Sequence, residues 1–429
     1  MKKLNTSPIS GMLELLPSEQ AIFNNYKSEI ERAYRLHGFQ NIETPTIDRN
    51  EILFAKAGGD TEKQIYRVIK TEESADDSTQ SLRYDHTVPL ARYIVEHESN
   101  LAFPFRVFQI GRNFRGERAQ KARFREFYQC DVDVIGRGEL SLSYDAEVIA
   151  TLVDALKTFK LPALKIRVNN RKFLSGVLDF LGVSEYASDI MSIIDHSEKV
   201  PAEKTTESLN SLGIPEETVV KITTFINTHG STTTLKNLDF LNFEDPRIAP
   251  GFSELEVVMH ELDLLGLSSI VEVDMKIVRG LDYYTGTVFE TNVPGYENLG
   301  SICSGGRYDN LASNFSDQSF PGVGGSIGLT RLYAVLGEAG LLNASAPAPV
   351  DIAIICLGDT HSAAYALAEK LRAAGKTCDV ILADKKLGDL MRHASRIAKS
   401  GIVVGENEAA SGNFMLKDFA TGESQPLEI

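Results

Sequence analysis

Apolar residues recur at helical spacing between residues 17 and 36, where they form one face of a segment whose other positions are polar. This spacing predicts an amphipathic helix, and Gly38 stands where a left-handed residue commonly ends a helix. The β-like run 39–45 follows and ends on Pro45, which has no backbone N–H to donate to a sheet. We therefore expect a helix and then a strand at a sheet edge or interface. The apolar positions of the helix are Ile22, Phe23, Tyr26, Ile30, Ala33 and Tyr34.

An antiparallel hairpin is predicted over residues 106–135. Side chains alternate between the two faces of a strand, so Gln129, Asp131 and Asp133 fall on one face of its second strand. The sequence thus gathers hydrogen-bonding side chains on one sheet surface. The first strand, the charged loop and the second strand of the hairpin are expected at residues 106–114, 117–123 and 124–135.

A long helical segment follows the hairpin. From about residue 173 to 262 the apolar spacing is mostly helical, and we can assign no chemistry to its side chains, so we interpret it as a helical insertion. Strand-like sequence returns at 274–278, before the polar and aromatic segment 279–290. Residues 1–342 therefore predict an α+β domain with a mostly antiparallel sheet.

A second domain is expected after residue 349. Residues 343–349 alternate small residues with prolines, a composition that resists helix and sheet and is typical of a linker. Residues 350–429 then alternate strand, helix, strand, helix and strand, which predicts a small α/β domain with a mostly parallel sheet.

The composition is that of an ordinary globular protein with an acidic balance. Its 429 residues carry 44 Lys and Arg against 59 Asp and Glu, a formal net charge of −15, which argues against broad nonspecific binding to nucleic acid. No stretch reaches the roughly 18 apolar residues of a membrane helix, and residues 1–8 lack the apolar core of a secretory signal. We therefore expect a cytoplasmic protein that does not enter a membrane.

Spacing argues against two common kinds of site. The four cysteines, Cys130, Cys303, Cys356 and Cys378, form no C-x-x-C pair, and the histidines form no ligand-like pair, so we expect neither a disulfide framework nor a metal site made by protein side chains. The chain also lacks the G-x-x-x-x-G-K-[ST] spacing of a P-loop.

The hairpin nevertheless carries groups that suit a nucleotide. Arginine forks match phosphate oxygens, and a phenylalanine face suits a purine ring. A polar strand face is often merely solvated, but the polar face of this hairpin is flanked by arginines and phenylalanines, so we interpret it as a ligand surface. The arginines are Arg112, Arg115, Arg118 and Arg123, and the phenylalanines are Phe114, Phe124 and Phe127.

Several motifs resemble those of the histidyl-tRNA synthetases, a family of class II aminoacyl-tRNA synthetases. Residues 114–127, FRGERAQKARFREF, resemble the second class motif, and residues 279–290, RGLDYYTGTVFE, resemble the histidine-specific signature. The helix that ends near Gly38, together with the segment up to Pro45, is similar to the first motif. Residues 322–331 are similar to the third motif, and residues 350–429 to the anticodon-binding module. The resemblance implies the class II catalytic fold and a homodimer formed through the first motif.

The resemblance also implies a reaction in two steps. L-Histidine attacks the α-phosphate of ATP to give histidyl-adenylate and pyrophosphate, and the acyl group then passes to the 3′ end of tRNA(His). Arg115 and Arg279 would stabilise the charge that develops on that phosphate. ATP, with Mg²⁺ bridging its phosphates, would contact Arg115, Glu117, Arg123, Phe127 and Arg331.

The resemblance also implies contacts to the acceptor end of the tRNA and to histidine, and helical spacing adds a third set of candidate residues. Arg118 and Gln120, in the hairpin tip, would reach the acceptor end of the tRNA. Arg392 and Arg396 form with Lys399 an i, i+4, i+7 stripe on a predicted helix that would meet anticodon phosphates, with a solvated charged face as the alternative. The histidine substrate would contact Asp85, Thr87, Gln129, Asp133, Tyr284 and Tyr308.

Three positions depart from the family pattern. Thr330 stands where the third motif usually has a glutamate before its arginine, here Arg331. Asp85 and Asp133 are one methylene shorter than the glutamates of some members, which would shift the ligand without changing the chemistry.

A non-catalytic alternative also fits part of the chain. Bacterial histidine biosynthesis uses a regulatory subunit of ATP phosphoribosyltransferase that resembles the synthetase core, binds histidine and charges no tRNA. That family usually lacks the last domain and often loses the motif arginines, whereas Arg115, Arg123, Arg279 and Arg331 are all present here. Kinase motifs and the motifs of class I synthetases are absent from the sequence. We therefore expect a histidine–tRNA ligase.

Overall fold

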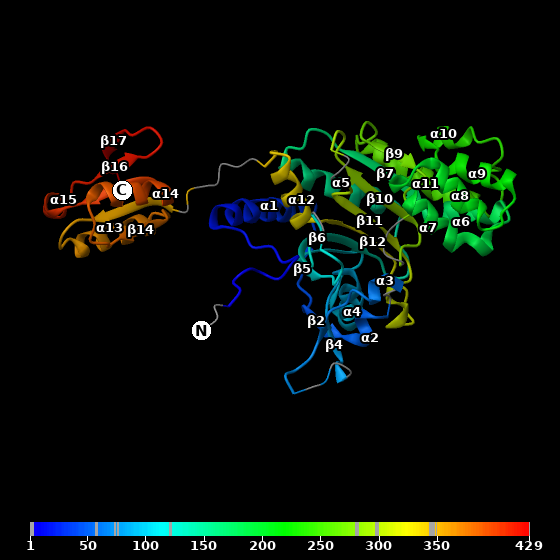
Figure 1. Cartoon of the computed structure of the whole chain (residues 1–429), viewed down its shortest axis with the longest axis horizontal. Coiled ribbons are helices and arrows are strands. Elements are labelled where there is room, and N and C mark those ends of the chain that lie inside the picture. Colours follow the sequence, from blue (N-terminus) through cyan, green and yellow to red (C-terminus); the bar gives the residue numbers. More distant parts are fainter. Residues whose placement is uncertain are drawn as a thin grey trace. The chain divides into compact units, whose positions relative to one another are not determined.

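The chain divides into two units, the larger mainly of residues 26–343 and the smaller mainly of residues 344–429. The computed structural model in Figure 1 describes residues 4–55, 59–72, 74, 77–119, 122–278, 283–296, 300–342, 348 and 350–428. Among the helices of these described residues, none is both long and apolar enough to cross a lipid bilayer.

A mostly antiparallel sheet forms the centre of the larger unit. Its strands in the described residues are β1 (Gln40–Asn41), β5 (Phe105–Phe114), β6 (Glu126–Ile135), β7 (Lys165–Asn170), β8 (His229–Gly230), β9 (Val271–Asp274), β10 (Thr287–Asn292), β11 (Cys303–Tyr308) and β12 (Gly322–Ile327). They lie in the order β1-β5-β6-β12-β11-β10-β7-β9-β8. Within this described sheet, β1–β5 and β7–β9 are parallel pairs and the other neighbours are antiparallel. The predicted fold class is thereby confirmed.

The predicted hairpin is the pair β5–β6. Phe114 lies opposite Glu126 near the tip, and Phe105 lies opposite Ile135 at the other end. Strand β1 pairs with β5 at the edge of the sheet, which confirms the edge strand expected after Gly38.

Helix α1 (Pro17–Leu36) has the predicted bounds, and Gly38, at φ +79°, follows it in the left-handed region. In α1 the side chains of Tyr26, Ile30, Ala33 and Tyr34 are buried, and the Tyr26 ring stacks on Phe159 with centroids 4.3 Å apart. The larger unit contains helices α4 (Thr87–His97), α5 (Ser143–Leu156) and α12 (Leu329–Glu338).

A buried ion pair ties α5 to the central sheet. Asp145 of α5 is 0% exposed and Arg307 of β11 is 4% exposed. The Arg307 guanidinium donates to Asp145 Oδ1 from Nη2 at 2.7 Å and to the Ser141 carbonyl at 2.9 Å. Because both charges are buried, the pair fixes the helix at one position along the strand.

The predicted helical insertion is present. Phe173, Phe225 and Phe252 pack in its core, with the Phe173 ring centroid 5.6 Å from Phe225 and 5.3 Å from Phe252. Figure 1 shows its helices gathered in one cluster beside the sheet. They are α6 (Arg171–Phe180), α7 (Ala187–His196), α8 (Ala202–Asn210), α9 (Glu216–Ile226), α10 (Thr232–Lys236) and α11 (Ala249–Leu264).

The prediction of a strand at residues 274–278 was wrong. Strand β9 ends at Asp274, whose side-chain Oδ1 accepts a hydrogen bond from the Lys276 backbone N–H at 2.9 Å and so begins a turn. Met275 and Ile277 are buried, at 0% and 3% exposed. Their apolar character, which suggested a strand, serves the packing of a turn instead.

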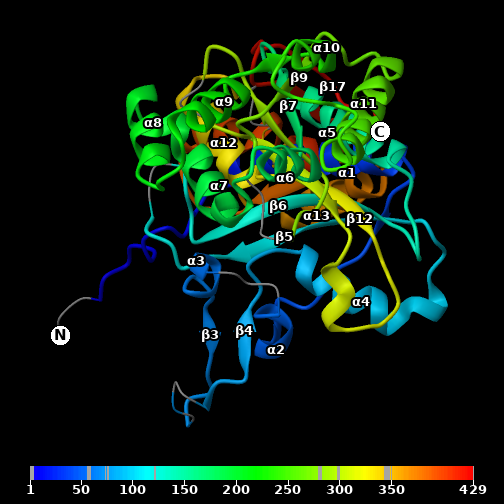
Figure 2. The ribbon, with the colours of Figure 1, turned by 90° about the vertical axis from the view of Figure 1, so that its right-hand side faces the viewer.

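A small second sheet projects from the larger unit in Figure 2. Its strands are β2 (Ile47–Arg49), β4 (Gln80–Leu82) and β3 (Arg67–Val68), in that order. The short helices α2 (Asn50–Leu53) and α3 (Gly59–Glu62) belong to the same part of the chain.

The smaller unit has the predicted alternation of strands and helices. Its parallel strands are β14 (Cys378–Ile381), β13 (Val350–Cys356) and β15 (Ala398–Val404), and its helices are α13 (His361–Ala373), α14 (Leu387–Ile397) and α15 (Glu406–Ser411). Two antiparallel strands that the sequence analysis missed, β16 (Met415–Asp418) and β17 (Ser424–Pro426), extend the sheet.

The predicted stripe of basic residues on this unit is shorter than expected. Helix α14 ends at Ile397, and Ala398 is already extended, at φ −130° and ψ 155°. Lys399 therefore lies on β15, where its Nζ is 2.7 Å from Oδ1 of Asp351. Arg392 and Arg396 alone share the helix.

Candidate active site

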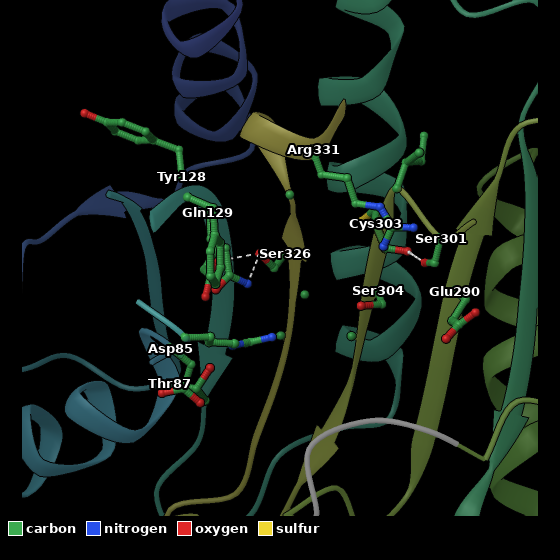
Figure 3. A pocket seen from close by; sticks show the side chains of 18 of the residues that line it. Asp85, Thr87, Tyr128, Gln129, Glu290, Ser301, Cys303, Ser304, Ser326 and Arg331 are labelled. Carbon is green, nitrogen blue, oxygen red and sulfur yellow. Dashed lines mark hydrogen bonds between the residues drawn. The ribbon is translucent and has the colours of Figure 1, made fainter. Parts of the chain in front are cut away.

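A cavity of about 500 Å³ lies against the central sheet, between α4, the β5–β6 hairpin, strands β10 to β12 and the start of α12. Figure 3 shows Asp85 and Thr87 toward one end of it and Arg331 toward the other. The residues expected from the sequence that line it are Asp85, Thr87, Arg115, Glu117, Arg123, Phe127, Gln129, Asp133, Tyr284, Tyr308 and Arg331. The structure thus brings together side chains up to 246 positions apart in sequence, from Asp85 to Arg331.

One end of the cavity is acidic. Asp85, Asp131 and Asp133 line it and are 2%, 4% and 3% exposed. The Tyr308 hydroxyl donates to Oδ1 of Asp133 at 2.7 Å. Burial raises the pKa of Asp85 to about 6, and burial, followed by the charge of Asp131, raises the pKa of Asp133 well above its usual value. This end therefore suits a ligand that supplies N–H donors and positive charge.

A chain of hydrogen bonds crosses the sheet beside these carboxylates. The Ser326 hydroxyl donates to Oδ1 of Asp131 at 2.5 Å. It also accepts from Nε2 of Gln129 at 2.9 Å, a bond drawn in Figure 3. The Gln129 carbonyl Oε1 accepts from Nδ2 of Asn113 at 2.8 Å. The Gln129 amide is therefore held on both sides.

The other end of the cavity is rich in arginine. The Arg115 guanidinium lies 5.2 Å from the centroid of the Phe127 ring, and its Nε donates to the Tyr84 carbonyl at 3.1 Å. Arg123 lies 3.5 Å from Glu117, between Nη1 and Oε2. Burial, and then the positive charge of Arg123, lowers the pKa of Arg331. Arginine forks close to an aromatic face suit phosphates and an adjoining base.

Glycine makes room for the acidic end on β12. A Cβ on Gly324 would lie 1.9 Å from Oδ1 of Asp133, and a Cβ on Gly322 would lie 2.3 Å from the Tyr308 ring. No side chain fits at either position. The glycine-rich stretch 322–328 thus lets two strands carry Asp133 and Tyr308 side by side.

Comparison with known proteins decides the family. The family model for histidyl-tRNA synthetase matches residues 11–332, and the model for the anticodon binding domain matches residues 351–429. The chain belongs to the histidyl-tRNA synthetase family. Its resemblance to that family, inferred from the motifs, is thereby confirmed.

Individual members of the family match along nearly their whole length. The chain is 41% identical to the histidine–tRNA ligase of Clostridium acetobutylicum over 100% of this chain and 99% of the relative, and 41% identical to that of Stenotrophomonas maltophilia over 97% and 94%. The crystal structure of histidyl-tRNA synthetase from Nostoc sp. PCC 7120 superposes with a TM-score of 0.86 at 37% identity, covering 99% of this chain and 97% of that one.

A more distant structure shares the fold alone. A Bacillus halodurans protein described as an ATP phosphoribosyltransferase regulatory subunit/histidyl-tRNA synthetase has a TM-score of 0.75 at 24% identity, and the match covers 91% of this chain and 97% of that one. Apo histidyl-tRNA synthetase of S. aureus, at 25% identity, has a TM-score of 0.71, and the match covers 100% of this chain and 97% of that one.

Thr330, where this synthetase departs from the family pattern, has a clear structural role. Its hydroxyl oxygen accepts a hydrogen bond from the Tyr128 backbone N–H at 2.7 Å. This bond joins the first turn of α12 to β6, next to Arg331. The departure therefore keeps a tie between the third motif and the hairpin.

The structure does not place every residue expected to act in this synthetase in the cavity wall. Arg279 and Gln120 lie outside the described residues. Arg118 is exposed near the hairpin tip and does not line the cavity. Arg392 and Arg396 are exposed on α14 of the smaller unit, where Nη1 of Arg392 lies 3.0 Å from Oδ1 of Asp389.

Several cavity residues were not given a role from the sequence. Asp131 was placed on the correct strand face, but no ligand or partner was assigned to it. Ser326 faces it only through the β6–β12 pairing, which sequence spacing does not reveal. Glu290 ends the signature segment, and its Oε2 accepts from Nη2 of Arg167 at 3.3 Å. The sequence signal that could have pointed to Glu290 as a cavity residue was its carboxylate at the end of a motif that belongs with the arginine-rich motifs.

Proposed function

We propose that this chain is a histidine–tRNA ligase that activates L-histidine with ATP and transfers the histidyl group to the 3′ end of tRNA(His). The observation that carries the proposal is a single cavity with an acidic, hydrogen-bonding end and an arginine-rich end. An amino acid and a nucleotide can lie end to end in it, so that carboxylate and α-phosphate meet in the middle. The full-length likeness to histidine–tRNA ligases supports the same conclusion.

The acidic end binds histidine. Asp85, with Thr87 and Gln129 beside it, receives the α-ammonium group, and Asp133 with Tyr284 and Tyr308 receives the imidazole ring. The Tyr308 hydroxyl already occupies Oδ1 of Asp133, which leaves Oδ2 to accept from a ring N–H. An apolar side chain of similar size would leave these buried polar groups unpaired. Such mispairing can lower kcat/KM for the apolar amino acid roughly 10⁴-fold relative to histidine.

The arginine-rich end binds ATP. Arg115 holds the α-phosphate, Arg123 and Arg331 hold the outer phosphates, and Phe127 stacks with the adenine. As the histidine carboxylate attacks, negative charge grows on the α-phosphate oxygens, and the prepositioned Arg115 stabilises it. Arg279, which lies outside the described residues, is proposed to act with Arg115.

Mg²⁺ fits the same end. Glu117 and Glu290 are carboxylates that line the cavity beside its arginines, and Mg²⁺ commonly uses one or two protein carboxylates together with substrate phosphates. When bound, it would neutralise phosphate charge.

The tRNA contacts are proposed from the exposed basic residues. Arg118 and Gln120, at the hairpin tip, would meet the acceptor end, and Arg392 and Arg396 would meet the anticodon region. We propose residues 1–342 as the catalytic domain, 343–349 as a linker and 350–429 as the anticodon-binding domain, a division that the family matches at 11–332 and 351–429 support.

We also propose a homodimer, through the segment that includes α1 and β1, and a cytoplasmic location. All four cysteines are unpaired thiols in the structure, which is typical of a reducing compartment. The regulatory-subunit alternative is not favoured, since Arg115, Arg123 and Arg331 all line the cavity.

Charging of tRNA tests this function. The purified full chain, given ATP, Mg²⁺ and radiolabelled histidine, should attach histidine to a tRNA(His) transcript and not to an alanine tRNA transcript. Failure to charge tRNA(His), with histidine still bound, would overturn the ligase assignment.

A further inference from the structure

Asp131 and Ser326 form a pair to which the proposed reaction assigns no role. They lie opposite each other on β6 and β12, and the Ser326 hydroxyl donates to Oδ1 of Asp131 at 2.5 Å. Asp131 is 4% exposed, Ser326 is partly buried, and both line the cavity. The pair is therefore a fixed part of the cavity wall.

The chemistry of the pair sets the direction of the hydrogen bonds around it. The Ser326 hydroxyl has one proton to donate, and it donates that proton to Oδ1 of Asp131. The Ser326 oxygen is left to accept, and its partner is Nε2 of Gln129 at 2.9 Å. The Gln129 carbonyl must then face away from Ser326, where Oε1 accepts from Nδ2 of Asn113 at 2.8 Å.

We infer that Asp131, acting through Ser326, fixes the orientation of the Gln129 amide so that its carbonyl oxygen is presented to the α-ammonium group of the substrate. The inference rests on the proposed function, in which Gln129 binds that group. A carbonyl oxygen has two lone pairs, and Asn113 uses one. In the reversed amide, the –NH₂ group would face the ammonium group, and two donors would oppose each other.

Asp131 and Ser326 are thus positioning residues for the recognition of an α-amino acid. Asp131→Asn no longer fixes which group donates in these hydrogen bonds. The new amide can donate to Ser326, whose hydroxyl can then donate to Oε1 of a reversed Gln129 amide. Ser326→Ala removes the link itself. Because Oδ2 of Asp131 also lies 3.4 Å from Nδ1 of the buried His86, the Ser326 variant keeps the inference testable if the Asp131 variant does not fold.

Calorimetric binding to the full-length protein tests the inference with two probes, L-histidine and 3-(imidazol-4-yl)propanoate, which lacks the α-amino group. Both variants should bind histidine about 10-fold more weakly, the loss of about one hydrogen bond, and bind the analogue as the wild type does. Ser326→Thr, which keeps the hydroxyl, should retain wild-type affinity. In a Gln129→Ala background, Asp131→Asn and Ser326→Ala should cause no further loss of histidine affinity.

Ser81→Ala is the matched control. The Ser81 hydroxyl is also buried and donates to a side-chain oxygen, Oδ1 of Asn50, at 2.6 Å, but Ser81 lies on β4 outside the cavity. Unchanged histidine affinity in Asp131→Asn and Ser326→Ala, or equal losses for histidine and the analogue, would overturn the inference. A wild-type protein without histidine-dependent ATP–pyrophosphate exchange would instead overturn the proposed function.

Discussion

The Tyr308 hydroxyl donates a hydrogen bond of 2.7 Å to Oδ1 of Asp133, and both side chains are buried on neighbouring parts of one sheet. Strand β12, which lies between their strands, carries glycine at both positions beside them, Gly322 and Gly324. The carboxylate is thus oriented before any ligand binds, which lowers the cost of ordering it at the moment of recognition.

Tyr308→Phe should weaken the use of histidine with little effect on ATP. The change removes one hydrogen bond to a carboxylate, so kcat/KM for histidine in ATP–pyrophosphate exchange should fall about 10- to 100-fold, while KM for ATP stays within about two-fold. Tyr34→Phe is a suitable control, because the Tyr34 hydroxyl bonds the Cys130 carbonyl at 2.8 Å and Tyr34 does not line the cavity. Equal losses in the two variants would contradict a role for Tyr308 in the pocket.

Asp85 should make the unliganded protein less stable as the pH rises. Burial raises its pKa from 3.8 to about 6 in the folded state, so the folded form keeps a proton that the unfolded form releases. The resulting stability is fully present below pH 3.8 and is lost progressively up to about pH 6, by on the order of 3 kcal/mol. Urea unfolding of the wild type between pH 4 and 7 should show this decline relative to Asp85→Asn. Parallel pH curves for the two proteins would contradict it.

The Arg307–Asp145 ion pair should be important for stability. Asp145→Ala would remove the buried carboxylate, 2.7 Å away, from a guanidinium that is 4% exposed, and would leave it the longer contact of 3.7 Å to Asp309. Removing one partner of a buried pair typically costs about 3–5 kcal/mol. Denaturant unfolding measures it. The double variant Asp145→Leu, Arg307→Met should lose much less, since no buried charge is left unpaired. A loss below about 1 kcal/mol in the single variant would show that the pair does not hold α5 on the sheet.

Arg167 should affect adenylation although it does not line the cavity. Its guanidinium is 3.3 Å from Oε2 of Glu290 in the cavity, 3.2 Å from Oδ2 of Asp274, and also pairs with Glu198 of the helical insertion. Arg167→Ala should reduce kcat for exchange roughly 10-fold, because Glu290 loses a charged donor. Glu198→Gln, which leaves the Glu290 contact in place, should stay within about two-fold of wild type. A larger loss of kcat in Glu198→Gln than in Arg167→Ala would show that Arg167 acts through the helical insertion and not through Glu290.

The sequence predicted what short-range periodicity controls. Alternation along β6 placed Gln129 and Asp133 on the cavity side, and helical spacing defined the bounds of α1. Contacts between distant segments could not be predicted, because no local pattern encodes them: Ser326 meets Asp131 across 195 positions, and Arg307 meets Asp145 across 162. Strands β16 and β17 were missed because their side chains are mostly exposed and carry little apolar alternation.

ATP–pyrophosphate exchange with each of the twenty amino acids tests whether one cavity joins histidine to ATP. The wild type should exchange with histidine alone. Arg115→Ala should lose about 100-fold in rate, the usual cost of removing one such contact to the transition state, while still binding histidine. Binding of histidine without any exchange, or exchange that persists undiminished in the Arg115 variant, would contradict this role of the cavity.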